Sequence, residues 1–216
     1  MALPTPLQMM GAPGSPYTRK MRAVLRYRGI PFTFIQQNSR EALKQPAPKV
    51  PLLPTFYLPG DDGEVVPTTD STPLIRLFER EFEGRSVIPP DPALAFLDEL
   101  LEDFADEWLT KCMFHYRWYP EADATKARRI LPHWSATQVT DEQIAPIQKM
   151  IGDRQIGRLW VVGSNDVTAE VIEKSYLHFL RVFDAQLQTR RFLFGARPAT
   201  SDFGIMGQLT CLALFD

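Results

Sequence analysis

Two strands and a helix are predicted in the stretch 53–78: Leu53-Pro54-Thr55-Phe56-Tyr57-Leu58, then Gly60-Asp61-Asp62-Gly63 and Val65-Val66, then Asp70-Ser71 before Pro73-Leu74-Ile75-Arg76-Leu77-Phe78. The Asp-Gly turn favours a hairpin between the two strands. Because Pro54 has no N–H, the backbone of Leu53 can face an extended ligand at the margin of the sheet. Asp70 and Ser71 precede an apolar helical pattern, whose first N–H groups lack internal partners and attract anions. The stretch therefore favours a site for an extended ligand that carries both a carboxylate and an amine.

The residues before this stretch alternate between strand and helix patterns. Residues 7–10 form a short apolar strand, Pro16 opens a helix that ends at Gly29, and residues 31–35 form a second strand. A strand–helix–strand unit places its two strands in parallel. With a short helix at 39–44, the order becomes βαβαββα, which predicts an α/β domain with a small four-stranded sheet.

Residues 84–92 read as a linker, because this segment is rich in residues that break helices. After it the strand signal disappears, and apolar residues recur at helical spacing. Helices are predicted at 93–116, 123–131, 141–159, 169–187 and from 199 to the end. We therefore expect an α/β domain at 1–83 and an all-α domain at 93–216.

Composition argues against several classes of protein. Lys and Arg number 24 against 26 Asp and Glu, and no basic tract stands out, so we expect no nucleic-acid partner. No apolar run approaches the roughly 20 residues of a membrane span, and the N-terminus lacks the pattern of a signal peptide. We therefore expect a cytoplasmic protein without membrane association. Cys112 and Cys211 have no metal-ligand spacing, which predicts reduced thiols and no bound metal.

Four motifs follow one another along the chain: Gly11-Ala12-Pro13-Gly14-Ser15-Pro16-Tyr17-Thr18-Arg19-Lys20-Met21-Arg22, Leu53-Pro54, Asp70-Ser71 and Gly195-Ala196-Arg197-Pro198-Ala199-Thr200-Ser201-Asp202. In this order they resemble motifs of the glutathione transferase superfamily, which has a thioredoxin-like first domain and a helical second domain. The resemblance makes the first motif the active-site turn, the second the family's cis-proline, the third the pair that holds the γ-glutamyl end of glutathione, and the fourth the capping motif of the helical core. Val50-Pro51 is a competing candidate for the cis bond; Leu53-Pro54 is preferred because a strand follows it directly.

The chain departs from the family pattern in two places. Ala199 stands where the capping motif usually has a Ser or Thr, so only the Asp202 half of the reciprocal cap is expected. Family members also carry further helices after this one, whereas the sequence stops at Asp216. Either the sequence is truncated or the ending is unusual.

The chemistry expected from the resemblance is activation of the glutathione thiol. A cysteine thiol has a reference pKa of about 8.5, so only a small fraction is thiolate at neutral pH. The N-terminus of the helix after Pro16 offers free N–H groups, and the Ser15 hydroxyl can donate a hydrogen bond to the sulfur. Ser15 is the preferred catalytic residue, although Ser followed by Pro is also an ordinary helix start. Tyr17 and Thr18 are the rival hydroxyls, and Tyr17 is also expected to line the site.

The remaining contacts of the ligands are less defined by the sequence. The glycine carboxylate of glutathione needs a cation, for which Arg40, Lys44 and Lys49 are candidates and Lys49 is preferred. An aromatic-rich segment follows the first long helix of the second domain, where the family lines its second-substrate pocket. The residues expected there are Phe114, Tyr116 and Trp118, although such aromatics are more often part of a core.

The resemblance implies a glutathione transferase-like enzyme that joins the glutathione thiolate to a small apolar electrophile, with glutathione as co-substrate. It also implies a homodimer, with the first domain of one subunit against the helices of the other. A glutathione-dependent peroxidase and a non-catalytic glutathione-binding protein remain alternatives. A thiol-disulfide reductase is disfavoured, because such an enzyme needs a cysteine in the active-site turn, which here carries Gly14-Ser15.

Overall fold

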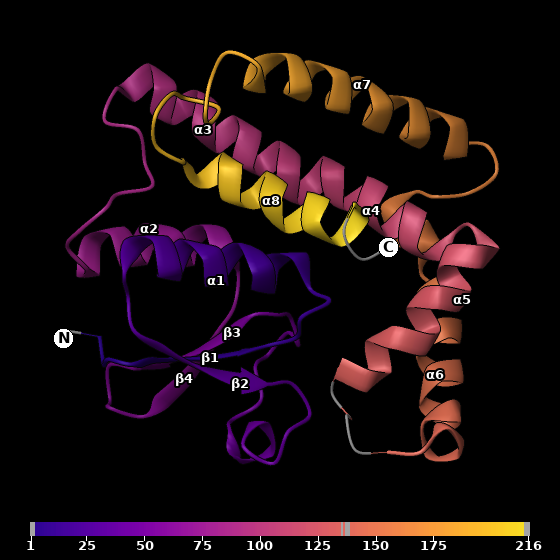
Figure 1. The fold of residues 1–216 in the computed structure, drawn as a ribbon. Coiled ribbons are helices and arrows are strands. Elements are labelled where there is room, and N and C mark those ends of the chain that lie inside the picture. Colours follow the sequence, from indigo (N-terminus) through magenta and orange to yellow (C-terminus); the bar gives the residue numbers. More distant parts are fainter. Residues whose placement is uncertain (1–2, 135, 137–138, 214–216) are drawn as a thin grey trace.

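The computed structural model describes residues 3–134, 136 and 139–213. It contains an α/β domain followed by a domain of helices that lies against it (Figure 1). The first domain consists of β1 (Leu7–Gly11), α1 (Pro16–Arg28), β2 (Phe32–Gln36), the 3₁₀ turn η1 (Ala42–Lys44), β3 (Thr55–Pro59), β4 (Val65–Thr68) and α2 (Ser71–Glu81). The predicted element order is confirmed.

The sheet has the strand order β2-β1-β3-β4. β1 and β2 are parallel, as the strand–helix–strand unit requires, and Met9 pairs with Phe34. β3 runs antiparallel to both of its neighbours, with Met9 of β1 opposite Phe56 and Val66 of β4 opposite Leu58. The Leu53-Pro54 peptide bond before β3 is cis, as the resemblance implied. The thioredoxin-like fold expected for this domain is therefore confirmed.

The core of the first domain lies between the sheet and the pair α1 and α2, which cover one face of the sheet and separate it from the second domain (Figure 1). α1 begins at its cap Ser15 and ends at Gly29, whose φ of 73° suits a residue without a side chain. Its inner face presents Met21 and Val24 to the sheet, and both are fully buried. Helix α1 is thus fixed against the sheet, and the turn before it, residues 11–15, follows directly from β1.

The second domain is made of helices, as expected. Its elements are α3 (Pro92–Asp103), the π-helical segment η2 (Phe104–Leu109), α4 (Thr110–Trp118), α5 (Glu121–Ile130), the 3₁₀ turn η3 (Leu131–Trp134), α6 (Asp141–Ile156), the 3₁₀ turn η4 (Leu159–Val162), α7 (Ala169–Leu187) and α8 (Thr200–Leu212). The continuous helix predicted at 93–116 is thus a run of α3, η2 and α4. No helix among the described ranges is both long and apolar enough to cross a bilayer.

Helix α8 joins the two domains. It lies along α1, and Phe203 belongs to the core of the first domain, 5.6 Å from the ring of Tyr27 between centroids. Gly207 permits this close approach, because a Cβ atom there would lie 2.5 Å from the backbone oxygen of Pro16. The start of α1 is therefore held between the sheet and the central helix of the second domain.

Candidate functional site

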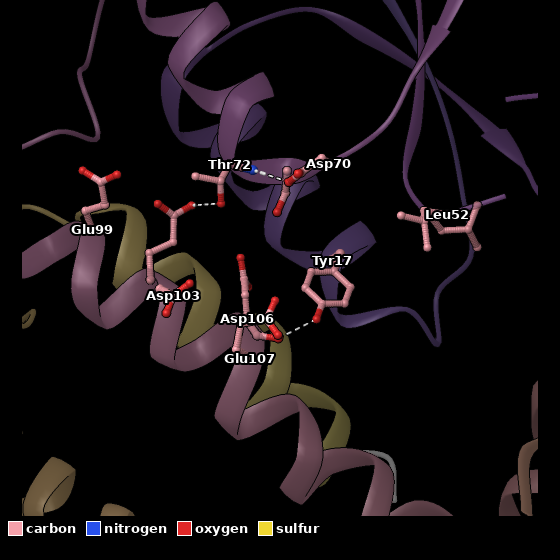
Figure 2. A pocket seen from close by; sticks show the side chains of 11 residues that line it. Tyr17, Leu52, Asp70, Thr72, Glu99, Asp103, Asp106 and Glu107 are labelled. Atoms are coloured by element: carbon pink, nitrogen blue, oxygen red, sulfur yellow. Dashed lines mark hydrogen bonds between the residues drawn. The ribbon is translucent and has the colours of Figure 1, made fainter. Parts of the chain in front are cut away.

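A cavity of about 430 Å³ lies between the two domains, beside the N-terminus of α2 (Figure 2). Its wall from the first domain consists of residues in α1, before β3 and at the start of α2: Tyr17, Leu52, Leu53, Asp70, Ser71 and Thr72. Its wall from the second domain carries acidic side chains of α3 and η2: Glu99, Glu102, Asp103, Asp106 and Glu107. The structure thus brings together four of the residues singled out in the sequence, namely Tyr17, Leu53, Asp70 and Ser71.

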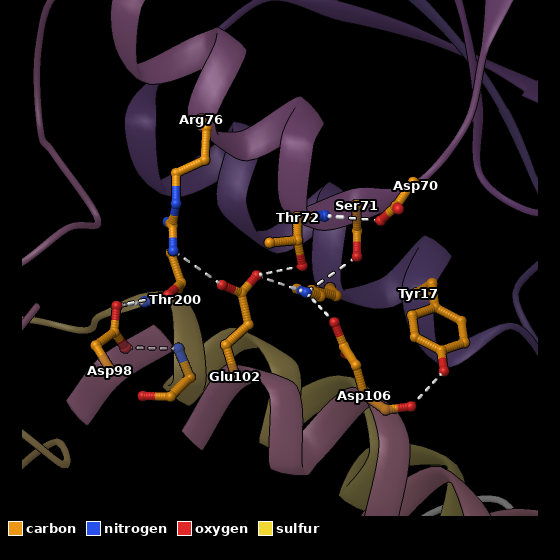
Figure 3. A network of polar contacts seen from close by, with 11 residues as sticks. Tyr17, Asp70, Ser71, Thr72, Arg76, Asp98, Glu102, Asp106 and Thr200 are labelled. Atoms are coloured by element: carbon orange, nitrogen blue, oxygen red, sulfur yellow. Dashed lines mark hydrogen bonds and ion pairs between the residues drawn. The ribbon is translucent and has the colours of Figure 1, made fainter. Parts of the chain in front are cut away.

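Asp70 takes a backbone conformation that is unusual for its residue type. It has φ 80° and ψ 116°, and its side chain accepts a hydrogen bond from the backbone N–H of Thr72 at 3.3 Å. A non-glycine residue in such a region costs on the order of 1–3 kcal/mol, and this strain gathers at functional sites. Asp70 therefore caps α2 in a strained geometry at the edge of the cavity (Figure 3).

A buried network of charges lies behind the start of α2. Lys20 of α1 is 1% exposed, and its Nζ atom lies 2.8 Å from Glu102 Oε1 and 2.5 Å from Asp106 Oδ2. The same Nζ donates a hydrogen bond to the Ser71 hydroxyl at 3.0 Å. Glu102 also accepts hydrogen bonds from Thr72 and Arg76, at 3.1 Å and 3.3 Å (Figure 3). The network therefore ties α1, α2 and α3 together directly beside the cavity.

The electrostatics of the acidic wall follow from this burial. Burial raises the pKa of the Asp106 carboxyl above its ordinary value, and the nearby Lys20 ammonium opposes this shift. Asp106 Oδ1 is buried, and no residue in the described part of the chain hydrogen-bonds to it. Paired buried charges of this kind give little net stability, but removing one partner leaves a costly unpaired charge. Lys20 is therefore the cation that pairs with Asp106, and it shares Glu102 with Arg76.

Tyr17 closes the cavity on the side of α1. Its hydroxyl donates to the backbone oxygen of Asp106 at 2.7 Å and lies 3.3 Å from Thr110 Oγ1 (Figure 2). Burial raises the pKa of Tyr17 to about 12, so the phenol is neutral at physiological pH. Tyr17 is thus a lining aromatic whose proton is already donated to the second domain.

The active-site turn expected from the sequence lies at the N-terminus of α1. Ser15 caps the helix by accepting a hydrogen bond from the backbone N–H of Thr18 at 3.2 Å. The turn is held by the second domain, since Arg117 Nη1 donates to the Gly14 carbonyl oxygen at 2.9 Å. A Cβ atom on Gly14 would meet the side chains of Leu131 and Trp134 at less than 3 Å. Ser15 is not among the residues that line the cavity described above.

Other residues singled out in the sequence lie elsewhere. Pro54 is buried behind the cavity wall, and Lys49 is exposed and does not line the cavity. Trp118 is 2% exposed within a core cluster against which Phe114 packs, and Tyr116 packs against Tyr176 at 5.3 Å between ring centroids. The structure therefore does not bring the three aromatic residues expected for a second-substrate pocket to this cavity.

Sequence reasoning missed the acidic wall and Lys20. Glu99, Asp103 and Glu107 recur at four-residue spacing, a pattern that marks one face of a helix, but a solvated face gives the same pattern. Lys20 lies among the buried positions of α1. A lysine on the apolar face of a helix is unusual, and this could have indicated a buried ion pair. Among the described residues, no group of three His, Cys, Asp or Glu side chains is placed to hold a metal ion.

Comparison with known proteins places this geometry in a family. Residues 9–86 match the sequence model of the glutathione S-transferase N-terminal domain. The first domain is thus similar to the N-terminal domain of glutathione S-transferases. This agrees with the cis-proline before β3 and with the Asp70-Ser71 pair at the start of α2. The resemblance to the glutathione transferase superfamily is therefore confirmed.

Solved structures with the same fold cover the second domain as well. FzlA from C. crescentus is 16% identical, with a TM-score of 0.58 over 100% of this chain and 80% of its own. A glutathione S-transferase from Methylobacterium radiotolerans, in complex with glutathione sulfonate, is 17% identical, with a TM-score of 0.52 over 96% of this chain and 79% of its own. One from Methylobacillus flagellatus with glutathione bound is 16% identical, with a TM-score of 0.54 over 97% and 84%. These likenesses show the glutathione transferase fold. No curated protein sequence matches the chain.

Proposed function

We propose that this protein binds glutathione in the cavity between the domains and activates its thiol for attack on a small electrophile. The observation that carries the proposal is that Leu53, Asp70 and Ser71 line the same cavity, beside a cis Leu53-Pro54 bond. In the described part of the chain, the Leu53 backbone has no backbone hydrogen-bond partner, so it is free to pair with a peptide. Two solved relatives of the same fold hold glutathione or glutathione sulfonate.

The γ-glutamyl end of glutathione carries both an ammonium and a carboxylate. The start of α2 supplies backbone N–H groups and the Ser71 hydroxyl for the carboxylate. Asp70 and Asp106 supply carboxylates for the ammonium, and both line the cavity. We assign the γ-glutamyl end to this region. Lys49 is the proposed partner of the glycine carboxylate, because it is an exposed base that precedes β3.

The thiol is proposed to lie at the N-terminus of α1, with Ser15 as the catalytic residue. The Ser15 Oγ atom accepts a hydrogen bond from Thr18, so its own proton is available for a sulfur anion. The helix terminus adds a favourable field for negative charge. Lowering the thiol pKa by about two units needs roughly 3 kcal/mol, which one charge-assisted hydrogen bond and a helix terminus can supply.

A second candidate function is glutathione binding without conjugation. The acidic character of the second-domain wall favours it, because the five carboxylates that line this cavity do not suit an apolar electrophile. A glutathione-dependent peroxidase fits the same acidic wall, since a hydroperoxide is small and polar. The second substrate therefore distinguishes conjugation, peroxidase activity and simple glutathione binding. The aromatic residues expected to bind an apolar electrophile do not line this cavity.

Binding of glutathione tests the proposal. We expect calorimetry to detect glutathione binding to the parent protein, and Ser71→Ala to weaken it about tenfold or more, the loss of one hydrogen bond to a charged group. Thr189→Ala is the matched control, because Thr189 lies just after α7, away from the cavity, and among the described residues its hydroxyl hydrogen-bonds to the Gln186 backbone oxygen. Absence of glutathione binding to the parent, or equal affinities of the parent and Ser71→Ala, would refute the proposed site.

We also propose that the protein is a homodimer, with the first domain of one subunit against α3 and α7 of the other. A groove of about 520 Å³ between these helices is lined mainly by apolar side chains, among them Leu97, Phe179 and Val182. Next to it on α3, Phe96 is 66% exposed and Leu100 is 54% exposed. An apolar surface of this extent is typical of an interaction site.

A further inference from the structure

The buried ammonium of Lys20 donates a hydrogen bond to the Ser71 hydroxyl. Its Nζ atom faces the oxygens of Ser71, Glu102 and Asp106 at 3.0, 2.8 and 2.5 Å. The side chain is 1% exposed, so water does not replace any of these partners. The ammonium therefore faces three protein oxygens: Ser71 and Asp106 accept hydrogen bonds from it, and Glu102 forms an ion pair with it.

An ammonium group donates hydrogen bonds and cannot accept them. In the contact with Lys20, the Ser71 oxygen must therefore be the acceptor. The Ser71 hydroxyl keeps one proton, and among the described residues no acceptor is hydrogen-bonded to it. Ser71 also lines the cavity, so its remaining proton is available to a ligand.

We propose that Lys20 is a positioning residue that fixes Ser71 as a donor and thereby makes the start of α2 selective for a carboxylate. The inference rests on the proposed binding of glutathione in this cavity, and it concerns the α-carboxylate of the γ-glutamyl residue. Lys20 acts through Ser71, because its own N–H groups are occupied by the protein. A ligand group that only donates, such as an ammonium, can use only the one remaining lone pair of the Ser71 oxygen and would lie close to the Lys20 charge, whereas a carboxylate takes the Ser71 proton.

The second domain controls this arrangement. Glu102 belongs to α3 and Asp106 to η2, and together they hold the Lys20 ammonium below the start of α2. Glu102 is itself held by Arg76 and Thr72 of α2 (Figure 3). Carboxylate recognition by the first domain therefore depends on side chains contributed by the second.

Two tripeptides test the inference: glutathione, and γ-aminobutyryl-cysteinyl-glycine, which lacks only the α-carboxylate of the γ-glutamyl residue. We expect the Lys20→Met variant to weaken glutathione binding about tenfold or more, and to leave the affinity for the analogue within about twofold. Ser71→Ala should show the same pattern. The double variant should bind glutathione no more weakly than Ser71→Ala alone, because both changes remove one interaction. Lys20→Arg, which keeps the charge and the donors, should restore most of the affinity.

Lys20→Met leaves the buried Asp106 carboxylate without its Lys20 cation and Glu102 with Arg76 as the remaining cation, which destabilises the folded state. A second variant, Lys20→Met with Asp106→Asn, removes one charge of each sign, and Glu102 keeps Arg76 and Thr72 as partners. Its reference is the Asp106→Asn variant. Relative to this reference, the double variant should bind glutathione about tenfold or more weakly and should bind the analogue with an affinity within about twofold.

Two results would overturn the inference while the proposed function stands: an equal loss of affinity for both tripeptides, or additive effects of Lys20→Met and Ser71→Ala on glutathione binding. A parent protein that binds neither tripeptide would overturn the inference and the proposed function together. If the parent binds glutathione, the proposed function stands, and the variants then test the role of Lys20 alone.

Discussion

Three hydroxyl groups near the cavity differ in what they can still donate. Ser15 and Ser71 each accept a hydrogen bond from the protein, from Thr18 N–H and from Lys20 Nζ, so each keeps a proton for a ligand. Tyr17 has already donated its proton to the Asp106 backbone oxygen. The two serines are therefore suited to bind anions, whereas Tyr17 has a structural role between the domains.

The role of Tyr17 predicts a dependence of stability on pH. Its pKa is raised from 10 to about 12, so the folded state keeps the proton that the unfolded state loses above pH 10. The stabilisation by Tyr17 is thus fully present below pH 10 and is lost between pH 10 and 12. Relative to Tyr17→Phe, the parent should lose about 1 kcal/mol of unfolding free energy between pH 9 and 11, measured by urea denaturation. Parallel pH profiles for the two proteins would contradict this.

Single residues could be predicted where the signal is local in sequence. Leu53, Asp70 and Ser71 were found because a proline, a turn and a helix start lie close together in the chain. Lys20 and its partners Glu102 and Asp106 are more than 80 positions apart, and only the packing of α1 against α3 and η2 brings them together. The aromatic segment 114–118 was ambiguous, because core residues and pocket residues have the same composition; in the structure Trp118 lies in a core cluster against which Phe114 packs.

Among the elements, α8 begins without the usual Ser or Thr cap, and a side chain of another helix replaces it. Asp202 accepts from the Ala199 backbone N–H at 2.9 Å, which is the half of the cap that the sequence predicted. The acceptor that Ala199 lacks is supplied by Asp98 of α3, which accepts from Thr200 N–H at 3.2 Å and from Ser201 N–H at 2.8 Å. Helix limits were predictable from caps and glycines, whereas this contact between helices was not.

Removal of the Asp98 side chain should therefore destabilise the protein. Asp98 is 1% exposed, and Asp98→Ala leaves two buried N–H groups and the Thr200 hydroxyl without their acceptor. We expect a loss of about 2–4 kcal/mol in the free energy of unfolding by urea, and a smaller loss for Asp98→Asn, which keeps one oxygen. Asp61→Ala, in the exposed hairpin turn, is the control and should stay within about 0.5 kcal/mol. An unchanged stability of Asp98→Ala would show that α8 needs no cap from α3.

At the scale of the whole molecule, the two domains meet along α1 and α8 (Figure 1). The cavity lies between the first domain and the acidic wall of α3 and η2, and a separate apolar groove lies between α3 and α7. The fold class was predictable because the strand signal ends at the linker and helical spacing follows it. The acidic wall was not predictable, because a solvated helix face and a cavity wall have the same spacing of charges.

The proposed homodimer predicts a specific effect of charges in the groove. Leu97→Glu combined with Val182→Glu should convert a dimer into a monomer, because two carboxylates would be buried without partners at the interface. Light scattering after size-exclusion chromatography measures the mass directly. Leu43→Glu, at a position 79% exposed in η1, is the control and should remain dimeric. A monomeric parent protein, or a dimer that tolerates both glutamates, would exclude this interface.

The most direct measurement is the titration of the thiol of bound glutathione, followed by the ultraviolet absorbance of the thiolate. We expect the bound thiol to ionise about two pKa units below the reference value of about 8.5. Ser15→Gly should return its pKa most of the way toward that value, while it changes helix stability by only a few tenths of a kcal/mol. A bound glutathione that titrates at the pKa of the free tripeptide would contradict thiol activation by this protein.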